Sequence, residues 1–139
     1  PAIVQRLEAE GYEVVEQILL ADDAAALKTT LTRLADQRQL DLILTTGGTG
    51  FGPRDVTPEA TMAVATRLAP GIAEAIRAVS LAITPRGMLS RAASVLRGKT
   101  LIVNLPGSPK AVCESMDVFL PQMPHALGLL RGEVNDCAR

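Results

Sequence analysis

The sequence has 139 residues, of which 47% are apolar but only 2% are aromatic, and its net charge at pH 7 is −1. This length predicts one domain, folded around a single core that must be almost wholly aliphatic. The near-neutral charge and the scarcity of rings exclude the basic surfaces and stacking platforms on which binding to nucleic acid or to an anionic membrane depends.

Cysteine and histidine are too few for a disulfide framework or for a zinc or iron centre. The chain has two cysteines, Cys113 and Cys137, and one histidine, His125. A secreted scaffold stapled by disulfides usually carries more cysteines. We therefore predict two free thiols in a cytoplasmic protein and a histidine on a helix surface. No apolar run in the sequence approaches the ~18 residues of a membrane-spanning helix.

The N-terminal part is predicted to form a helix, a strand and a second helix. Residues 1–10 suit a helix, because Pro1 fits the first helical position and Gly11 ends the pattern. Residues 12–20 are rich in aliphatic side chains, several of them β-branched, and are predicted to form a strand. The second helix has leucines at helical spacing, and Asp22 is placed to cap it.

A buried strand and two helices follow. The continuously apolar centre of residues 40–46 is typical of a strand in a parallel sheet that is covered on both faces. Thr57 offers a capping hydroxyl, and Pro58 fits the first position of the next helix. The Pro-Gly pair at residues 70–71 interrupts this helix, and helical periodicity resumes over 72–82.

The C-terminal part is predicted to form a hairpin and a long helix. Residues 90–96 and 100–105 flank an Arg-Gly-Lys turn, and a helix that two prolines interrupt covers 108–131. Strands that alternate with helices predict a single α/β domain over residues 1–139, with three layers and a mostly parallel sheet covered by helices on both faces. Because such domains normally begin with a strand, we also expect that an N-terminal strand is missing here.

A loop of glycine and threonine, TTGGTG at residues 45–50, follows the buried strand. It therefore lies at the carboxyl edge of the sheet, where open α/β sheets bind ligands. Glycines let successive backbone N–H groups point into one concavity that suits an anion, and the helix that begins at Pro58 favours negative charge at its N-terminus. We predict a phosphate-binding loop; the alternative is a turn shaped only by chain geometry.

Two familiar nucleotide-binding motifs do not match this loop. A P-loop would need a lysine, which residues 45–50 lack. The Gly-x-Gly-x-x-Gly pattern that starts at Gly48 meets Pro53 at its last position. The loop is therefore neither a P-loop nor a dinucleotide-binding turn.

A second loop of the same kind, NLPGSPK, spans residues 104–110. It follows an apolar strand and opens a helix, for which Ser108 can serve as the cap and Pro109 as the first residue. Lys110 adds a cation beside the free amides of the helix. A routine strand-to-helix turn with a solvated lysine is the alternative. Two phosphate loops at one sheet edge would form a cleft for a substrate with several phosphates.

Asp55 is a carboxylate beside a predicted phosphate loop, where it would repel the ligand unless a cation lay between them. Magnesium is usually held by one or two carboxylates together with substrate phosphate oxygens, so Asp55 is the candidate metal ligand. The alternative is a turn aspartate paired with Arg54. Asp22 could face the same crevice, or could simply cap its helix.

Several stretches along nearly the whole chain are characteristic of one protein family. They are LILTTGGTGFGPRDVTPEAT, PGIAEAIR, the Leu89-Ser90-Arg91 segment and GKTLIVNLPGSPKAV, followed by the C-terminal PHALGLLRG. In these stretches the sequence resembles the MoaB/Mog family, the molybdopterin adenylyltransferases of molybdenum-cofactor biosynthesis, which are related to the G domain of gephyrin. The resemblance implies the molybdopterin-binding fold.

The resemblance also implies an activity and the residues that perform it. In the family, ATP adenylylates the terminal phosphate of molybdopterin and pyrophosphate is released, with Mg²⁺ as the cofactor. Asp55 and Asp22 match two acids implicated in catalysis and in Mg²⁺ binding. The implied substrate-binding residues are Thr46, Gly47, Gly48, Thr49, Gly50, Ser90, Arg91, Gly107, Ser108 and Lys110.

The partners that the resemblance implies are molybdopterin, ATP, further copies of the chain in a homotrimer or a dimer of trimers, and a downstream molybdenum-insertion protein. Neither nucleic acid nor a membrane is among them. Family members carry a leading strand that contributes to nucleotide binding and is absent from this sequence. The alternatives are a paralogue that binds the pterin without adenylyl transfer, a scaffold module, and another phosphate-binding α/β domain.

Overall fold

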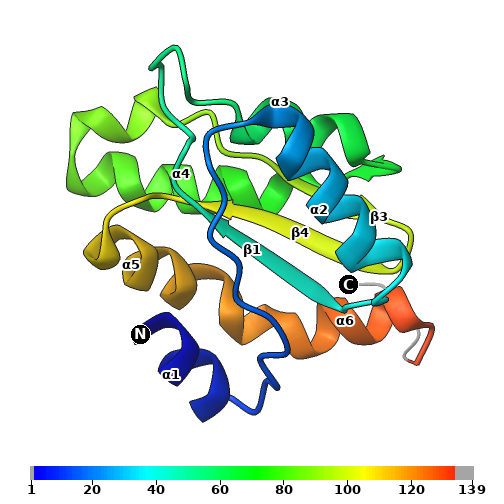
Figure 1. Ribbon diagram of the computed structural model, residues 1–139. Helices are drawn as coiled ribbons and strands as arrows, with labels where there is room; N and C mark the ends of the chain where they lie inside the picture. Colours follow the sequence, from blue (N-terminus) through cyan, green and yellow to red (C-terminus); the bar gives the residue numbers. More distant parts are fainter. Residues whose placement is uncertain (1, 134–139) are drawn as a thin grey trace.

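The computed structural model describes residues 2–133, in which helices pack on both faces of one sheet (Figure 1). The helices are α1 (Ala2–Ala9), α2 (Ala24–Asp36), α3 (Thr57–Val64), α4 (Pro70–Ile83), α5 (Pro109–Phe119) and α6 (Met123–Arg131), with 3-10 helices η1 (Pro85–Leu89) and η2 (Leu120–Gln122). The strands are β1 (Leu42–Thr46), β2 (Arg67–Leu68), β3 (Ser94–Arg97) and β4 (Thr100–Leu105). None of the helices within residues 2–133 combines the length and apolar character that crossing a membrane requires.

The four strands form one sheet in the order β1-β4-β3-β2. β1 runs parallel to β4, with Thr46 opposite Leu105 at the carboxyl ends of both strands. β3 is antiparallel to both β4 and β2, so three of the four strands run in one direction and β3 alone opposes them. The predicted hairpin is confirmed, with Arg97 opposite Thr100. The layered α/β class is confirmed as well.

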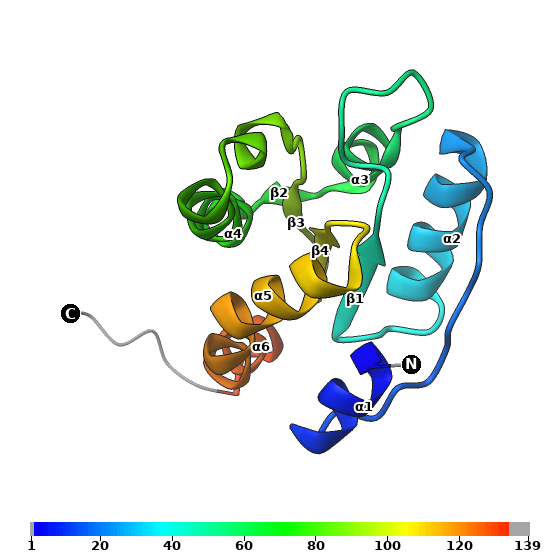
Figure 2. The same cartoon turned by 90° about the vertical axis from the view of Figure 1, so that its left-hand side faces the viewer.

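Helices cover both faces of the sheet (Figure 2). An aliphatic core lies on each face, between the strands and these helices. Side chains alternate along the strands. In β4, Val103 packs toward α4, α5 and α6, whereas its neighbour Ile102 packs toward α2 and α3. In β1, Leu44 and Ile43 divide between the two cores in the same way. Because both faces are covered, the central parts of β1 and β4 read as continuous apolar runs, as predicted for residues 40–46.

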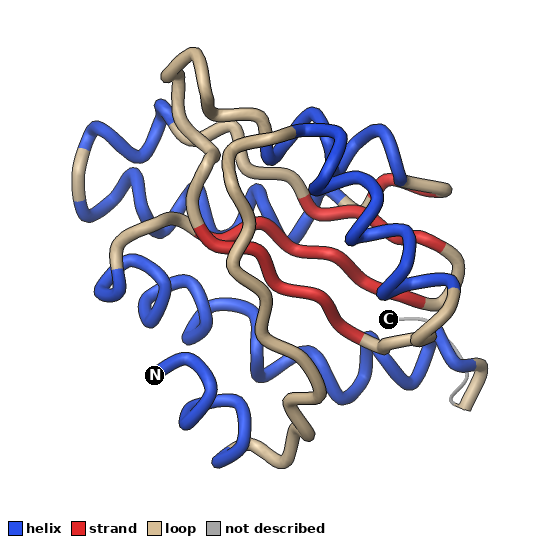
Figure 3. Tube along the Cα trace, in the orientation of Figure 1, coloured by secondary structure: helices blue, strands red, loops and turns tan. Residues whose placement is uncertain are grey.

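The strand predicted over residues 12–20 is wrong. Figure 3 shows this segment as a loop that connects α1 to α2. A strand requires a partner for its backbone N–H and C=O groups, and in the described part of the chain β1 pairs only with β4. A cavity lined by Val14 and Ile18 on one side and by Leu44 on the other lies between the segment and β1, so no ladder forms.

The starts of three helices refine the predictions. Asp23, rather than Asp22, caps α2 and accepts the N–H groups of the first turn. The capping role predicted for Thr57 is wrong: Thr57 is the buried first residue of α3, and the cap position is Val56, whose side chain makes no capping hydrogen bond. The predicted interruption at residues 70–71 is real, and its proline begins α4. Two-residue β2, which lies just before it, was not predicted.

The C-terminal region agrees with the prediction for residues 108–131. The helix breaks at η2, because Pro121 lies within that 3-10 turn and Pro124 is the second residue of the next helical segment, α6. His125 lies exposed on α6, as predicted. Cys113 is a free thiol, while the prediction for Cys137 falls outside the described residues.

Candidate functional site

The two predicted phosphate loops lie side by side at the carboxyl ends of β1 and β4. The Gly47 N–H donates to the carbonyl oxygen of Leu105 at 3.0 Å, which ties the first loop to the strand that precedes the second. Gly107 lies so close that a Cβ added there would be 3.5 Å from the Gly47 Cα. The φ of Gly47 is +81°, a conformation that favours glycine. Backbone contact therefore holds both loops together at one sheet edge.

The first loop closes onto the start of α3 through a contact that requires glycine. The φ of Gly48 is +69°, and a Cβ added there would lie 2.3 Å from Thr57 Oγ1. In return, the Thr57 N–H donates to the carbonyl oxygen of Gly48 at 3.2 Å. The N-terminus of α3, where backbone N–H groups lack helical partners, is thus held beside the loop.

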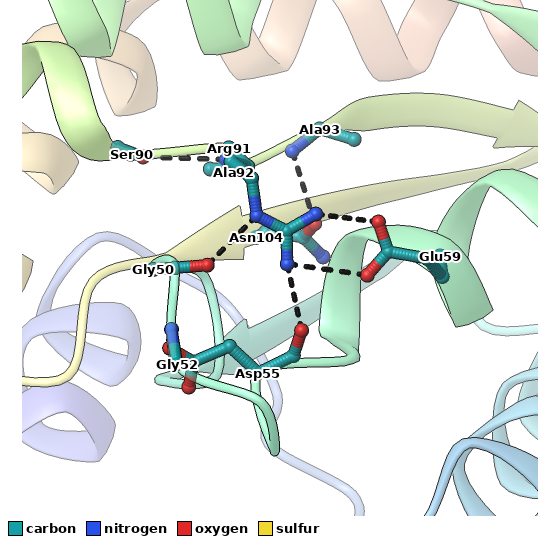
Figure 4. A network of polar contacts seen from close by, with 9 residues as sticks. All are labelled: Gly50, Gly52, Asp55, Glu59, Ser90, Arg91, Ala92, Ala93 and Asn104. Carbon is teal, nitrogen blue, oxygen red and sulfur yellow. Dashed lines mark hydrogen bonds and ion pairs between the residues drawn. The ribbon is translucent and has the colours of Figure 1, made fainter.

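Asn104 joins the elements that lie below the loops. It is 0% exposed, and its side-chain nitrogen donates to Thr45 Oγ1 at 3.0 Å and to Thr61 Oγ1 at 2.9 Å. Its side-chain oxygen accepts the Ala93 N–H at 3.0 Å (Figure 4). One fully bonded amide therefore links β4 to β1, to α3 and to the segment before β3. Asn104 was not among the predicted site residues, although a lone polar residue in the aliphatic run LIVNL was the available signal.

The carboxylate of Asp55 folds back between two glycines. Its Oδ2 accepts the Gly52 N–H at 2.9 Å, and the Asp55 N–H donates to the Gly52 carbonyl at 3.0 Å. A Cβ added at either Gly50 or Gly52 would lie 2.9 Å from the same Oδ2. These two glycines are therefore required by the close approach of the carboxylate. The side-chain hydrogen bond of Asp55 goes to a backbone amide, and not to Arg54.

A cavity of about 420 Å³ lies beside the first loop. Its lining comes mainly from α1, the segment between α1 and α2, α2 and β1, and most of these side chains are aliphatic. Its polar end is formed by Asp22, Asp23, Thr46, Gly47, Gly48 and Thr57. Asp22 and the start of the glycine loop therefore share one cavity. The remaining predicted site residues that do not line it are Thr49, Gly50, Asp55, Ser90, Arg91, Gly107, Ser108 and Lys110.

The second loop presents the start of α5 to solvent. The Ser108 Oγ accepts the Ala111 N–H at 3.2 Å, which confirms the predicted capping role. Pro109 is the first residue of the helix, and Lys110 is exposed in its first turn. An exposed cation beside the free N–H groups of a helix N-terminus can attract an anion.

Arg91 contacts the first loop from the segment before β3, and Ser90 directly precedes it. The Arg91 Nε donates to the carbonyl oxygen of Gly50 at 2.7 Å, and its guanidinium forms an ion pair with the carboxylate of Glu59. The Arg91 hydrogen bond is the main cause that lowers the pKa of Glu59 and, reciprocally, raises that of Arg91. The Ser90 Oγ accepts the Ala92 N–H at 3.2 Å. The role of Glu59 was not predicted, because its partner is 32 residues away.

The carboxylates near the loops suit a cation that the substrate also ligates. Within residues 2–133, no group of three or more His, Cys, Asp or Glu side chains could hold a metal ion by itself. Asp55 Oδ1 accepts no hydrogen bond from the described residues, and Asp22 is exposed. One or two carboxylates are what Mg²⁺ takes from a protein when phosphate oxygens and water complete its shell. A single carboxylate, such as that of Asp55, is therefore chemically compatible with an ion whose other ligands are phosphate oxygens and water.

Comparison with known proteins identifies the family. A family model described as a probable molybdopterin binding domain matches residues 1–125. The chain belongs to this family. The relatives and solved structures described next confirm the resemblance to MoaB/Mog proteins.

Two solved structures of the molybdopterin-binding family cover most of the chain. The molybdopterin biosynthesis enzyme MoaB of Thermus thermophilus is 49% identical, with a TM-score of 0.88 over 94% of this chain and 82% of that one. The Mog protein of Mycobacterium ulcerans is 42% identical, with a TM-score of 0.88 over 94% of this chain and 84% of that one.

Curated members of the family carry the name molybdopterin adenylyltransferase. The Helicobacter pylori J99 protein is 40% identical over 121 residues, which make up 87% of this chain and 66% of that protein. The Haemophilus influenzae protein is 48% identical over 103 residues, which make up 74% of this chain and 52% of that protein. The chain thus spans between about half and two thirds of the length of these relatives. It shares its family with proteins of molybdenum-cofactor biosynthesis.

Proposed function

We propose that this protein adenylylates the terminal phosphate of molybdopterin, with Mg-ATP as the second substrate and pyrophosphate as the second product. The observation that carries the proposal is the pair of loops that meet at Gly47 and Gly107, each of which leads to a helix N-terminus. Two adjacent sites for anions suit a reaction that joins two phosphate groups. The names of the relatives in Helicobacter pylori and Haemophilus influenzae support the same activity.

The reaction demands positioning more than proton transfer. A phosphate oxygen of molybdopterin attacks the α-phosphorus of ATP, the new P–O–P linkage forms, and the bond to pyrophosphate breaks. The attacking phosphate is already ionised near neutral pH, so no general base is required. The protein must bring two anions together and stabilise the charge of the leaving group, which fixed dipoles and cations do well. The candidate site accordingly offers amides, hydroxyls and a lysine.

The chain's own groups divide this work between the two loops. The amides of residues 48–50 and the hydroxyls of Thr46 and Thr49 would bind the pterin and its phosphate from one side, with Gly47 lining the pocket while its own N–H is bonded to Leu105. Ser108 and Lys110 of the second loop would anchor phosphate from the other side, together with the amide of Gly107. Ser90, which is adjacent to Arg91 in the chain, would contribute a further hydroxyl. Each of these groups is a donor or a cation, as a phosphate requires.

Asp55 and Asp22 are the residues that would hold Mg²⁺, in company with ATP phosphate oxygens and water. When bound, the ion neutralises charge on the reacting phosphates. Asp55 has one carboxylate oxygen free for this purpose among the described residues, because Gly52 occupies only the other. Asp22 lies where the shared cavity meets the glycine loop.

The decisive experiment is pyrophosphate release by the purified chain given molybdopterin and Mg-ATP. Release should require the pterin, and Asp55→Asn should lower kcat by about 100-fold or more while sparing pterin affinity, since the shape is kept and the charge is lost. Asp41→Asn is the matched control, because Asp41 lies exposed at the opposite end of β1. A version extended by the expected N-terminal strand tests whether that strand supplies part of the ATP site.

Absence of turnover in both versions, with molybdopterin still bound, would contradict the enzyme and leave a pterin-binding paralogue or a scaffold. A fall in pterin affinity in Asp55→Asn would instead assign Asp55 to pterin binding. Loss of activity in Asp41→Asn as well would show that the assay reports general damage.

We further propose that the chain works as a homo-oligomer, a trimer or a dimer of trimers. Supporting this, α4 is apolar on nearly all sides and yet leaves Val79, Leu81 and Ile83 between 41% and 55% exposed. Met88 and Leu89 of η1 are exposed as well, at 61% and 45%. A helix that is apolar all round is normally buried, so a second copy is the expected cover. The adenylylated product would pass to a molybdenum-insertion protein.

A further inference from the structure

The guanidinium of Arg91 holds both ends of the loop tip that carries Asp55. Its Nε donates to the carbonyl oxygen of Gly50 at 2.7 Å, and its Nη2 donates to that of Asp55 at 2.6 Å. Both carboxylate oxygens of Glu59 accept from the same guanidinium (Figure 4). The Arg91 backbone N–H adds a bond to the carbonyl oxygen of Thr49 at 2.7 Å. One residue from the segment before β3 thus fastens the loop on either side of residues 51–54.

The tip itself has few other restraints. Residues 51–54 are exposed, and Phe51 is 69% exposed. The hydrogen bonds within the tip are the two that join Gly52 and Asp55. Glycines on both sides of Phe51 leave the backbone conformationally free. The position of the Asp55 carboxylate therefore depends on what fixes the carbonyl groups at the two ends of the tip.

Arg91 is poorly placed to bind a substrate phosphate as well. A guanidinium has five N–H donors, and four hydrogen bonds already direct the Arg91 group at protein oxygens. Glu59 neutralises its charge and orients its plane through a two-point contact. The residue that sequence resemblance assigned to the substrate pocket has its donors turned toward the loop.

We propose that Arg91, oriented by Glu59, is a positioning residue that sets the place of the Asp55 carboxylate relative to the glycine loop. This inference rests on the proposed function of Asp55 in adenylyl transfer. Lysine cannot replace the arginine, because an ammonium lacks the planar fork that reaches two carbonyl groups and a carboxylate at once. A misplacement of about 1 Å can cost a reaction of this kind about 100-fold in rate.

The chain contains a matched control in Arg97. Its guanidinium also makes a two-point contact with a carboxylate, that of Asp36, at 2.9 and 2.7 Å. It also donates to a backbone carbonyl, that of Val64, at 2.9 Å. Arg97 lies at the opposite end of β3 from Arg91. Arg97→Lys therefore removes the same kind of network from the same sheet, away from the glycine loop.

The test compares Arg91→Lys, Arg97→Lys and Glu59→Gln in the full chain. Pyrophosphate release is measured against Mg²⁺ and molybdopterin concentration, urea unfolding reports stability, and hydrogen exchange follows the amides of residues 50–55. In Arg91→Lys we expect kcat to fall about 10- to 100-fold, the Mg²⁺ requirement to rise and the exchange of these amides to speed up, with KM for molybdopterin unchanged. Glu59→Gln should show the same changes more weakly. Arg97→Lys should alter stability alone.

Several outcomes would overturn the inference. One is an Arg91→Lys protein with normal kcat, Mg²⁺ requirement and amide exchange. Another is a rise in KM for molybdopterin with kcat intact, which would make Arg91 a substrate ligand. A loss that Arg97→Lys reproduces would make the effect one of stability. If the wild-type chain has no turnover, the proposed function fails. Whether Arg91 positions Asp55 is then decided by comparing the wild-type chain with Arg91→Lys, in amide exchange of residues 50–55 and in binding of Mn²⁺ alone.

Discussion

At the scale of single residues, the candidate site depends on contacts that leave no space for a Cβ atom. Gly52 and Gly50 both border Asp55 Oδ2. Neither has a positive φ, so their role is to let the carboxylate approach the backbone. Gly48 is constrained twice, by its φ and by the Thr57 hydroxyl. The glycine content of the loop thus reflects three separate close approaches as well as flexibility.

Replacing Gly52 with alanine should displace the Asp55 carboxylate and leave the fold intact. The added Cβ would lie 2.9 Å from Oδ2, a distance that real Cβ atoms do not tolerate. We expect pyrophosphate release to fall about 10-fold or more and urea stability to change little, because the residue is exposed. In Gly71→Ala, the control, the Cβ meets nothing within 4 Å, and this helical position should gain roughly 0.5 kcal/mol. Undiminished activity in Gly52→Ala would mean that the carboxylate moves without consequence.

Residue-level predictions from sequence succeeded where one position alone had the required chemistry. Ser108 was the only hydroxyl placed to cap α5, and it does so. Asp22 and Asp23 are adjacent and chemically equal, so sequence could not decide which one caps α2. The capping role predicted for Thr57 was wrong for a different reason. Its side chain contacts Gly48, which is a tertiary contact, and the cap position is the residue before it. Asn104 and Glu59 have partners far along the chain, which a single sequence does not reveal.

At the scale of elements, α4 and η1 form a unit that is packed on one side only. Gly87 of η1 presses against the backbone of α4, where an added Cβ would lie 2.6 Å from the Leu81 nitrogen. This contact fixes the turn between them and presents Ile83 and Met88 on the outside, at 55% and 61% exposure. Exposed apolar side chains that cluster on one surface mark an interface.

Ile83→Glu should weaken the proposed association between copies of the chain. A charge placed in an apolar interface loses its hydration without gaining a partner, so the mass measured by light scattering should fall toward that of one chain. Leu19→Glu is the control, because Leu19 is 99% exposed in the loop between α1 and α2. An unchanged mass for Ile83→Glu, or a monomeric wild type, would remove α4 and η1 as the interface.

Element types were predictable wherever the hydrophobic period was supported by a capping or breaking residue. The helices after Pro58, Pro70 and Pro109 began at or beside these prolines. Residues 12–20 have the composition of a strand, and their exposure even alternates over 12–16. They form none, because a strand is defined by its neighbour, and composition carries no information on whether a neighbour is present. Two-residue β2 is set by its pairing with β3 in the same way.

At the scale of the whole molecule, ion pairs between arginine and carboxylate connect distant parts of the chain. Hydrogen bonds from arginine are the main cause that lowers the pKa of three carboxylates. These pairs are Arg33 with Glu16, Arg97 with Asp36 and Arg91 with Glu59. All three carboxylates have ordinary values of 4.5 or 3.8. Together they should set the response of the fold to acid.

The melting temperature should fall on acidification below about pH 4.5. A carboxyl group whose folded pKa lies below its unfolded value contributes stability that is present above the unfolded pKa, and this contribution is lost as pH falls through the folded pKa. Thermal unfolding between pH 7 and pH 3 measures this, and added salt should reduce the drop because the pairs are partly exposed. A melting temperature that rises toward pH 3 would contradict the assignment.

The fold class was predictable because alternating apolar strands and capped helices admit few layered solutions. The direction of β3 followed from the turn at residues 97–99. The cavity beside the glycine loop and the surroundings of Asp55 were harder to predict. They are assembled from six or more separate elements and loops.

The contact between Gly47 and Gly107 has a consequence for the choice of ligand. No side chain lies between the two loops at this point, so the separation of the proposed phosphate sites is set by backbone against backbone. Backbone contacts of this kind do not adjust as rotamers do. The site would then discriminate between ligands by the distance between their anionic groups. Bisphosphates joined by spacers of increasing length should inhibit best at one length, and Gly107→Ala should shift that optimum to a longer spacer.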